Sequence, residues 1–178
     1  MDRKWLVFII IGNVVLIAAL CLLPQGIKTF LFEPFAIPSG AMIPTIEPGD
    51  RVLANKLAIR RGEALEHGDI VVFDDPTGEY PQLISRIIGL EGDVIDLQEG
   101  SVLRNGEVLD EPYTCGSPTH PLGVQSFPLV VPEGSMLVMG DNRTNSADGR
   151  VYGALPIETV RGIVSWRYWP PDRSGTVE

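Results

Sequence analysis

The chain has 178 residues and a formal net charge of −9, enough length for one globular domain with an anchor segment. An acidic chain without a basic cluster argues against nucleic acid as a partner, because phosphate binding needs clustered lysine and arginine. Its two cysteines, Cys21 and Cys115, lie in unlike contexts, so we expect no disulfide. Two cysteines cannot build a thiolate metal site, and we predict no metal and no other cofactor.

The first predicted element is a membrane helix over residues 5–23, a stretch that carries no charge. As a helix it would be about 28 Å long, close to the hydrocarbon thickness of a bilayer. Arg3 and Lys4 precede it, so the positive-inside rule predicts that residues 1–4 are cytoplasmic. The remainder would lie on the outer or periplasmic side of the cell membrane.

Two alternatives for this segment are a cleaved signal peptide and a lipoprotein anchor at Cys21. The apolar run is long for a signal peptide, and no small-x-small cleavage site follows it. For a lipoprotein, Leu20 stands where a small residue is expected. We therefore predict an uncleaved single-pass anchor followed by an exported domain over residues 24–178.

The exported domain is predicted to be mainly β and antiparallel, because short apolar runs alternate with turn-forming residues. Asn105-Gly106 lies between two of these runs and predicts a two-residue hairpin turn. Residues 26–33 are ambiguous, since they can also extend the membrane helix by a turn or two. The predicted strands cover residues 51–54, 70–73, 83–90, 94–97, 101–103, 127–131, 136–139 and 162–169.

Four segments, in this order, resemble the motif boxes of the type I signal peptidases. They are FEPFAIPSGAMIPT (residues 32–45) followed by Gly49-Asp50, GDIVVF (68–73), LISRIIGLEGD (83–93) and MGDNRTNSADGRVYG (139–153). A single Gly-Asp pair is uninformative, but four boxes in order behind one anchor are a specific pattern. The resemblance covers residues 32–172 and implies a β domain of the signal peptidase type.

The resemblance also implies a reaction. In this family a serine nucleophile hydrolyses an amide bond, and a lysine acts as the general base. The lysine must be neutral to accept a proton, so an apolar site has to lower its pKa. The substrates are signal peptides of exported preproteins, which bind in an extended form with small side chains in an Ala-x-Ala pattern.

Two departures affect this chemistry directly. The first box of the family has Ser-Gly-Ser-Met with the second serine as nucleophile, and this chain has Ala41 there. The third box has the lysine base before its arginine, and this chain has Ser85. A methyl group cannot attack a carbonyl, and a hydroxyl is a poor base near neutral pH. Losing such a residue costs about a millionfold in rate, so the chain is predicted not to cleave.

Two explanations of the double loss remain: the chain is a natural non-cleaving paralogue, or an active signal peptidase in which the two residues were replaced deliberately. A non-cleaving paralogue would hold signal peptides or preproteins at the outer membrane face, or modulate an active paralogue. A purely structural, membrane-tethered β domain that has also lost substrate binding is the alternative function. A relocated active site is not favoured. Ser39 has no matched base beside it, Lys56 is interpreted as a solvated charge at a strand end, and His67 and His120 lie in turn-like polar or proline-rich contexts.

The resemblance assigns roles to further residues. Ser39 corresponds to an oxyanion-hole hydroxyl and Ser146 to a serine that orients the lysine. Ala41 and Ser85 are expected to lie side by side, and Arg86 is expected to reach Asp141. A structural network under the site is expected from Arg86, Asp141, Arg143, Asp148 and Arg150. The walls of the substrate pockets are expected from Phe35, Ile37, Pro38, Met42, Ile46, Val52, Leu83 and Ile84.

Overall fold

The computed structural model describes residue 13 and residues 31–123 and 125–177. The predicted cytoplasmic residues 1–4 lie outside this part, as does the predicted anchor at 5–23 except for residue 13. Among the described residues, no helix has both the length and the apolar character that crossing a bilayer requires.

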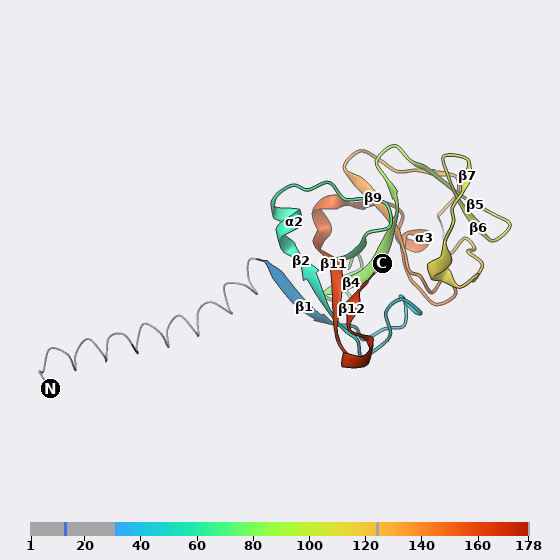
Figure 1. The fold of residues 1–178 in the computed structure, drawn as a ribbon. Helices are drawn as coiled ribbons and strands as arrows, with labels where there is room; N and C mark the ends of the chain where they lie inside the picture. Colours follow the sequence, from blue (N-terminus) through green and yellow to red (C-terminus); the bar gives the residue numbers. More distant parts are fainter. Residues whose placement is uncertain (1–12, 14–30, 124, 178) are drawn as a thin grey trace, which may run out of the picture.

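An antiparallel sheet forms the body of the domain (Figure 1). Its central strands β3 and β4 are joined by a hairpin in which Ile70 pairs with Arg86 and Asp74 with Gln82. The prediction of a mainly β, antiparallel domain is therefore confirmed. The strand order is β1 (Phe32–Ala36), β2 (Arg51–Asn55), β11 (Val160–Trp169), β3 (Ile70–Asp74), β4 (Gln82–Leu90), β9 (Ser135–Met139) and β10 (Leu155–Pro156), with β12 (Gly175–Thr176) paired to β11.

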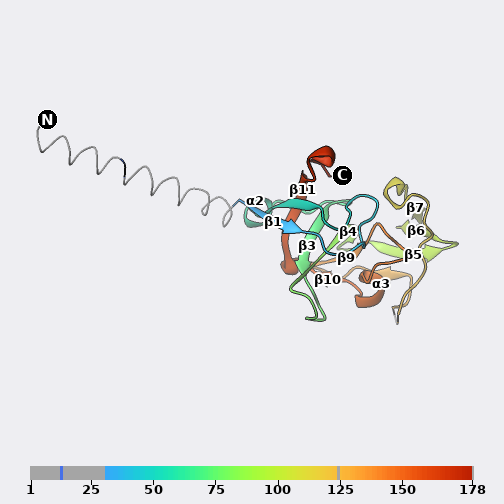
Figure 2. The same cartoon turned by 90° about the horizontal axis from the view of Figure 1, so that it is seen from below.

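A smaller sheet lies at the end of the domain away from β1 and β2 (Figure 2). Asn105 and Gly106 have φ values of 55° and 86°, the positive pair that a two-residue hairpin turn requires. The predicted hairpin at this position is thus confirmed. The strands of this sheet are β7 (Glu107–Val108), β6 (Ser101–Arg104), β5 (Val94–Gln98) and β8 (Leu129–Val130), in that order.

Both faces of the main sheet are covered, which explains the unbroken apolar run in β3. Ile70 and Val72 join a core cluster on one face, whereas Val71 and Phe73 join a second cluster on the other. Side chains alternate between faces along a strand, so a strand buried on both sides has no polar position. A third cluster, around Ile88 and Ile95, packs between the two sheets.

The helical elements are short: α2 (Lys56–Arg60), α3 (Gly149–Tyr152), and the 3-10 turns Pro112–Thr114, Ile157–Thr159 and Pro171–Arg173. Asn55 caps α2, because its side chain accepts hydrogen bonds from the N–H groups of Leu57 and Ala58. The possible extension of the membrane helix as far as residue 33 is wrong. Phe32 and Glu33 already belong to β1, where they pair with Asn55 and Ala54 of β2.

Candidate active site

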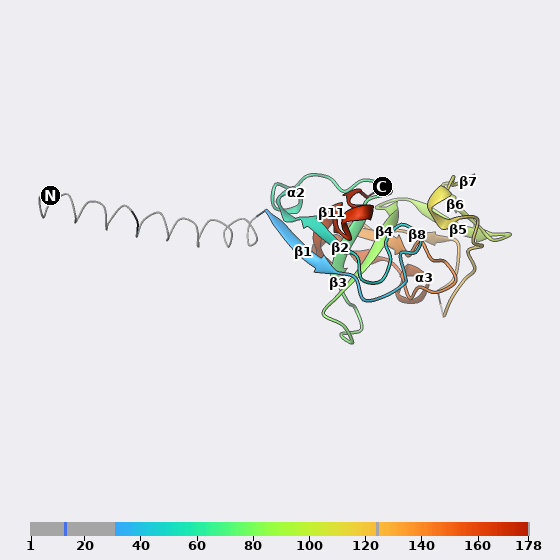
Figure 3. The ribbon, with the colours of Figure 1, turned by 60° about the horizontal axis from the view of Figure 1, so that its bottom comes forward.

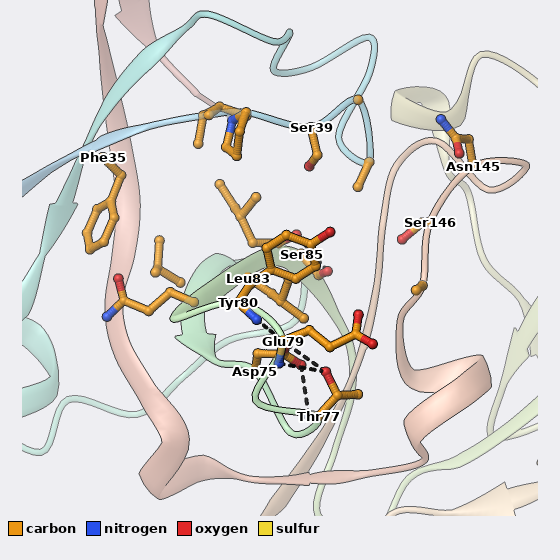
Figure 4. A pocket seen from close by; sticks show the side chains of 18 of the residues that line it. Phe35, Ser39, Asp75, Thr77, Glu79, Tyr80, Leu83, Ser85, Asn145 and Ser146 are labelled. Atoms are coloured by element: carbon orange, nitrogen blue, oxygen red, sulfur yellow. Dashed lines mark hydrogen bonds between the residues drawn. The ribbon is translucent and has the colours of Figure 1, made fainter.

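An open pocket of about 560 Å³ lies between the first motif box and β4 (Figure 4). The loop between β3 and β4 closes one side of it and projects from the sheet (Figure 3). We call it the β1–β4 pocket. Its lining consists of residues 35–41, Val72, Asp75, Thr77, Glu79, Tyr80, residues 82–85, residues 145–147 and Tyr152.

Ala41 lies on a turn that follows β1. Two backbone hydrogen bonds close the base of this turn, from Ile37 N–H to the Asp50 carbonyl at 2.9 Å and from Gly49 N–H to the Ile37 carbonyl at 2.8 Å. The turn is also tied to the fourth box, because Asn142 N–H donates to the Ala41 carbonyl at 3.0 Å. These contacts fix the backbone at position 41 without involving its side chain.

Gly140 permits this close approach of two boxes. A Cβ atom at this position would lie 2.5 Å from the Ala41 carbonyl oxygen and 2.3 Å from Ser146 Oγ. Both distances are too short for non-bonded atoms, so a side chain here would push the segments apart. Glycine is therefore required by packing, although its φ is not in the left-handed region.

Ser85 also lines the pocket, so Ala41 and Ser85, the two residues that differ from the family pattern, lie in one cavity. Its side chain is buried, and its hydroxyl donates to the carbonyl oxygen of Ile84 at 2.7 Å. The hydroxyl of Ser146 is buried as well, but it has no hydrogen-bond partner among the described residues. An unpaired buried hydroxyl is unusual and costly, so this one marks a position where a donor or acceptor is missing.

Behind the pocket, Arg86 and Asp141 form a buried ion pair. The guanidinium donates to both carboxylate oxygens, with Nε–Oδ1 at 2.9 Å and Nη2–Oδ2 at 2.7 Å. Arg86 also donates to the Gly68 carbonyl, and the hydroxyl of Thr45 donates to Asp141. The expected contact between Arg86 and Asp141 is confirmed, and it links the first, second, third and fourth boxes.

The remaining network residues are paired in two further groups. Asp148 accepts two hydrogen bonds from the Arg150 guanidinium at 2.9 Å and one from Gly140 N–H at 3.0 Å. Arg143 pairs instead with Glu111, at 2.6 and 3.0 Å. Glu111 was not predicted, because it lies outside the motif boxes, in the segment between β7 and β8.

Tyr113 connects these groups. The Arg86 guanidinium lies over its ring, 4.0 Å from the ring centre, and its hydroxyl donates to Glu111 at 2.9 Å. Burial raises the pKa of Tyr113, and the neighbouring Glu111 carboxylate raises it further. The phenol therefore stays protonated and remains a donor, which joins the Arg86 and Arg143 ion pairs.

Comparisons with known proteins agree with this architecture. A family model described as "Signal peptidase, peptidase S26" matches residues 6–169. The chain belongs to this family. It is 39% identical over 160 residues to a probable signal peptidase I-2 of a Synechocystis species, covering 86% of this chain and 71% of that one.

Two other relatives and one solved structure extend the comparison. Signal peptidase I of Leptolyngbya laminosa is 38% identical over 86% of this chain and 76% of its own. Thylakoidal processing peptidase 1 of Arabidopsis thaliana is 37% identical over 82% of this chain, but over 44% of its own length. A crystal structure of a signal peptidase I from Enterococcus faecalis superposes with a TM-score of 0.51 and 27% identity, covering 57% of this chain and 97% of that one.

The structure separates the eight residues expected to form the signal peptidase pocket walls into two groups. Phe35, Ile37, Pro38, Leu83 and Ile84 line the β1–β4 pocket. Met42, Ile46 and Val52 do not line it. All three are 0% exposed and belong to the core cluster that packs against this face of the sheet. The structure thus places these three side chains in the core cluster and not among the lining residues of the pocket.

The loop between β3 and β4 also belongs to the site, although its sequence did not predict this. Asp75 stabilises it by accepting hydrogen bonds from the N–H and hydroxyl of Thr77 and from the N–H of Tyr80. Burial opposes ionisation of Asp75, but these hydrogen bonds outweigh it and lower the pKa of its carboxyl. The loop is made of turn-forming residues and contains no motif. Pairing the strands on either side of it as a hairpin would have placed it beside Leu83.

Proposed function

We propose that this member of the signal peptidase family binds signal peptides of exported preproteins without cleaving them. It would do so at the outer face of the cell membrane, tethered by residues 5–23, and would hold a preprotein or modulate an active paralogue. The observation that carries the proposal is that Ala41 and Ser85 line one pocket, at the positions that the family resemblance assigns to nucleophile and base.

A replacement base is not apparent among the described residues that line the pocket, since none is a lysine, histidine or arginine. Lys56 pairs with Glu33 at 2.8 Å, and His67 with Asp93 at 2.7 Å, and neither lines the pocket. Asp75 is a weak base, because its pKa is lowered. The hydroxyls of Ser39, Ser85 and Ser146 thus have no amine or imidazole to activate them.

The backbone supports the binding part of the proposal. β1 is the first strand of the sheet and pairs with β2 on one side. Residues 82–85 of β4 pair with β3, whereas the pairing with β9 begins at Arg86. In the described part of the chain, no strand pairs with the second side of either segment. An extended peptide can therefore add to these two edges across the pocket, a binding mode that does not need the missing catalytic groups.

The test is a binding experiment with the full chain in detergent micelles. A fluorescent, Ala-x-Ala-containing signal-peptide mimic is titrated and followed by anisotropy, and mass spectrometry then checks that the peptide is intact. Ala36→Trp fills the pocket beside β1 and should weaken binding at least tenfold. Val108→Trp, on the exposed surface of β7, is the control and should bind as the unmodified chain does. Absence of binding by the unmodified chain would contradict the proposal, as would equal binding by Ala36→Trp.

A further inference from the structure

The charged side chains of the β1–β4 pocket are all acidic. Asp75 and Glu79, both on the β3–β4 loop, are the residues with a formal charge in its described lining. Figure 4 shows them beside Tyr80 at the side of the pocket that this loop forms. Neither carboxylate forms an ion pair within the described residues, so their charge is not neutralised by the protein.

These carboxylates also act on Tyr152, another residue of the lining. Burial raises the pKa of Tyr152, and the negative charges of Asp75, Asp148 and Glu79 raise it further. Tyr152 lines the same pocket, so these negative charges act on a group within it. A cation entering the pocket would be stabilised by this potential, and an anion would be repelled.

The inner part of the pocket offers hydrogen-bond acceptors. Ser146 points into the cavity in Figure 4, and its buried hydroxyl has no partner in the described part of the chain. The Ser85 hydroxyl donates its proton to the Ile84 carbonyl, so its oxygen can only accept a further hydrogen bond. A ligand that brings donors can therefore bond to both hydroxyl oxygens.

A lysine side chain combines the required properties. Its ammonium has three donors, no acceptor and a positive charge, and its methylene stem can lie against apolar walls such as Leu83. We propose that the pocket selects peptides with a lysine whose ammonium binds Ser146 Oγ, with Asp75 and Glu79 favouring its charge. This proposal rests on the proposed function, because it assumes that the pocket holds an extended peptide.

The experiment compares lysine with norleucine, which has a similar stem and no charge. Capped Ala-x-Ala peptides carry one lysine or one norleucine at each position in turn, and each dissociation constant is measured with the full chain in micelles. At one position we expect the lysine peptide to bind about tenfold more tightly, the size of one hydrogen bond to a charged group. Ser146→Ala and Glu79→Gln should both reduce this lysine-to-norleucine ratio. Glu107→Gln, on exposed β7, should leave it unchanged.

The outcomes separate the two proposals. If norleucine peptides bind and no lysine position gains affinity, the lysine selection is wrong and the peptide-binding function stands. If Ser146→Ala weakens lysine and norleucine peptides equally, the hydroxyl has a structural role and the selection is also wrong. If neither series binds, both proposals are overturned.

Discussion

The backbone N–H of Asn142 donates a hydrogen bond to the backbone carbonyl of Ala41, at 3.0 Å. The Asn142 side chain adds a second bond, from Nδ2 to the Gly40 carbonyl, also at 3.0 Å. Both bonds hold the turn of the first box against the fourth box, and both are accepted by main-chain carbonyls of the first box. The frame of the site is therefore independent of whether position 41 carries a methyl or a hydroxymethyl group.

The contact between these two boxes depends on Gly140. Gly140→Ala would place a Cβ atom within 2.5 Å of the Ala41 carbonyl oxygen and should destabilise the fold by about 1–3 kcal/mol, the usual range for overpacking. Gly175→Ala is the matched control, because no atom lies within 4 Å of its added Cβ. Urea unfolding of both variants measures the difference. Equal stability would show that the boxes are not in close contact.

The Arg86–Asp141 pair should contribute strongly to stability. Asp141→Asn leaves a buried guanidinium without its full countercharge and should cost about 3–5 kcal/mol. Asp74→Asn removes the carboxylate from the exposed Arg161–Asp74 pair and should cost less than about 1 kcal/mol. A similar midpoint shift for both variants in urea unfolding would rule out a central structural role for the buried pair.

Two adjacent residues test whether the first box contributes to the core. Met42 is 0% exposed and Ile43 is 38% exposed. Met42→Ala should destabilise the domain by about 2–5 kcal/mol, since it leaves a cavity in a packed cluster. Ile43→Ala should have a much smaller effect. If Met42→Ala instead left stability unchanged and altered peptide affinity, the side chain would belong to the pocket wall.

The ionisation of Asp93 should make the stability of the fold depend on pH. Burial opposes its ionisation, but hydrogen bonds from Leu90 N–H, the His67 ring and the Asn105 amide outweigh it and hold its pKa below the ordinary 3.8. A lowered folded-state pKa stabilises the fold above the unfolded-state pKa, and this contribution is lost as pH falls through the folded-state value. Asp93→Asn should therefore be less stable than the unmodified chain at pH 6, and the gap should narrow below about pH 3.8. A gap that widens with acid would contradict this assignment.

Strand positions were predictable because apolar runs and turn residues alternate along the chain. β1 was not predicted as a strand, since it is short, contains Pro34 and follows directly on the apolar N-terminal segment. Pro34 is tolerated because β1 is an edge strand, where one side of the backbone needs no hydrogen bonds. The short helix α2 was also missed, as its capping residue Asn55 belongs to the preceding strand.

Within the site, the motif resemblance identified residues in or near the boxes. It did not indicate which of their side chains are buried. Met42 adjoins the nucleophile position and yet points into the core, because neighbouring residues of the turn face opposite ways. Glu111 is separated from its partner Arg143 by 32 residues, and no local pattern indicates such a pairing. The acidic β3–β4 loop lies at the pocket because the pairing of β3 with β4 positions it there, and no local sequence motif indicates this.

We infer that this chain retains the frame of a signal peptidase and lacks two of its catalytic side chains. The most direct measurement is cleavage of a fluorogenic signal-peptide mimic, in detergent, by four forms of the full chain. The unmodified chain, Ala41→Ser and Ser85→Lys should show no turnover above background, because each lacks a nucleophile, a base or both. The double variant Ala41→Ser/Ser85→Lys should regain cleavage, with Ser146 available to accept a hydrogen bond from the lysine. Robust turnover by the unmodified chain would contradict the account.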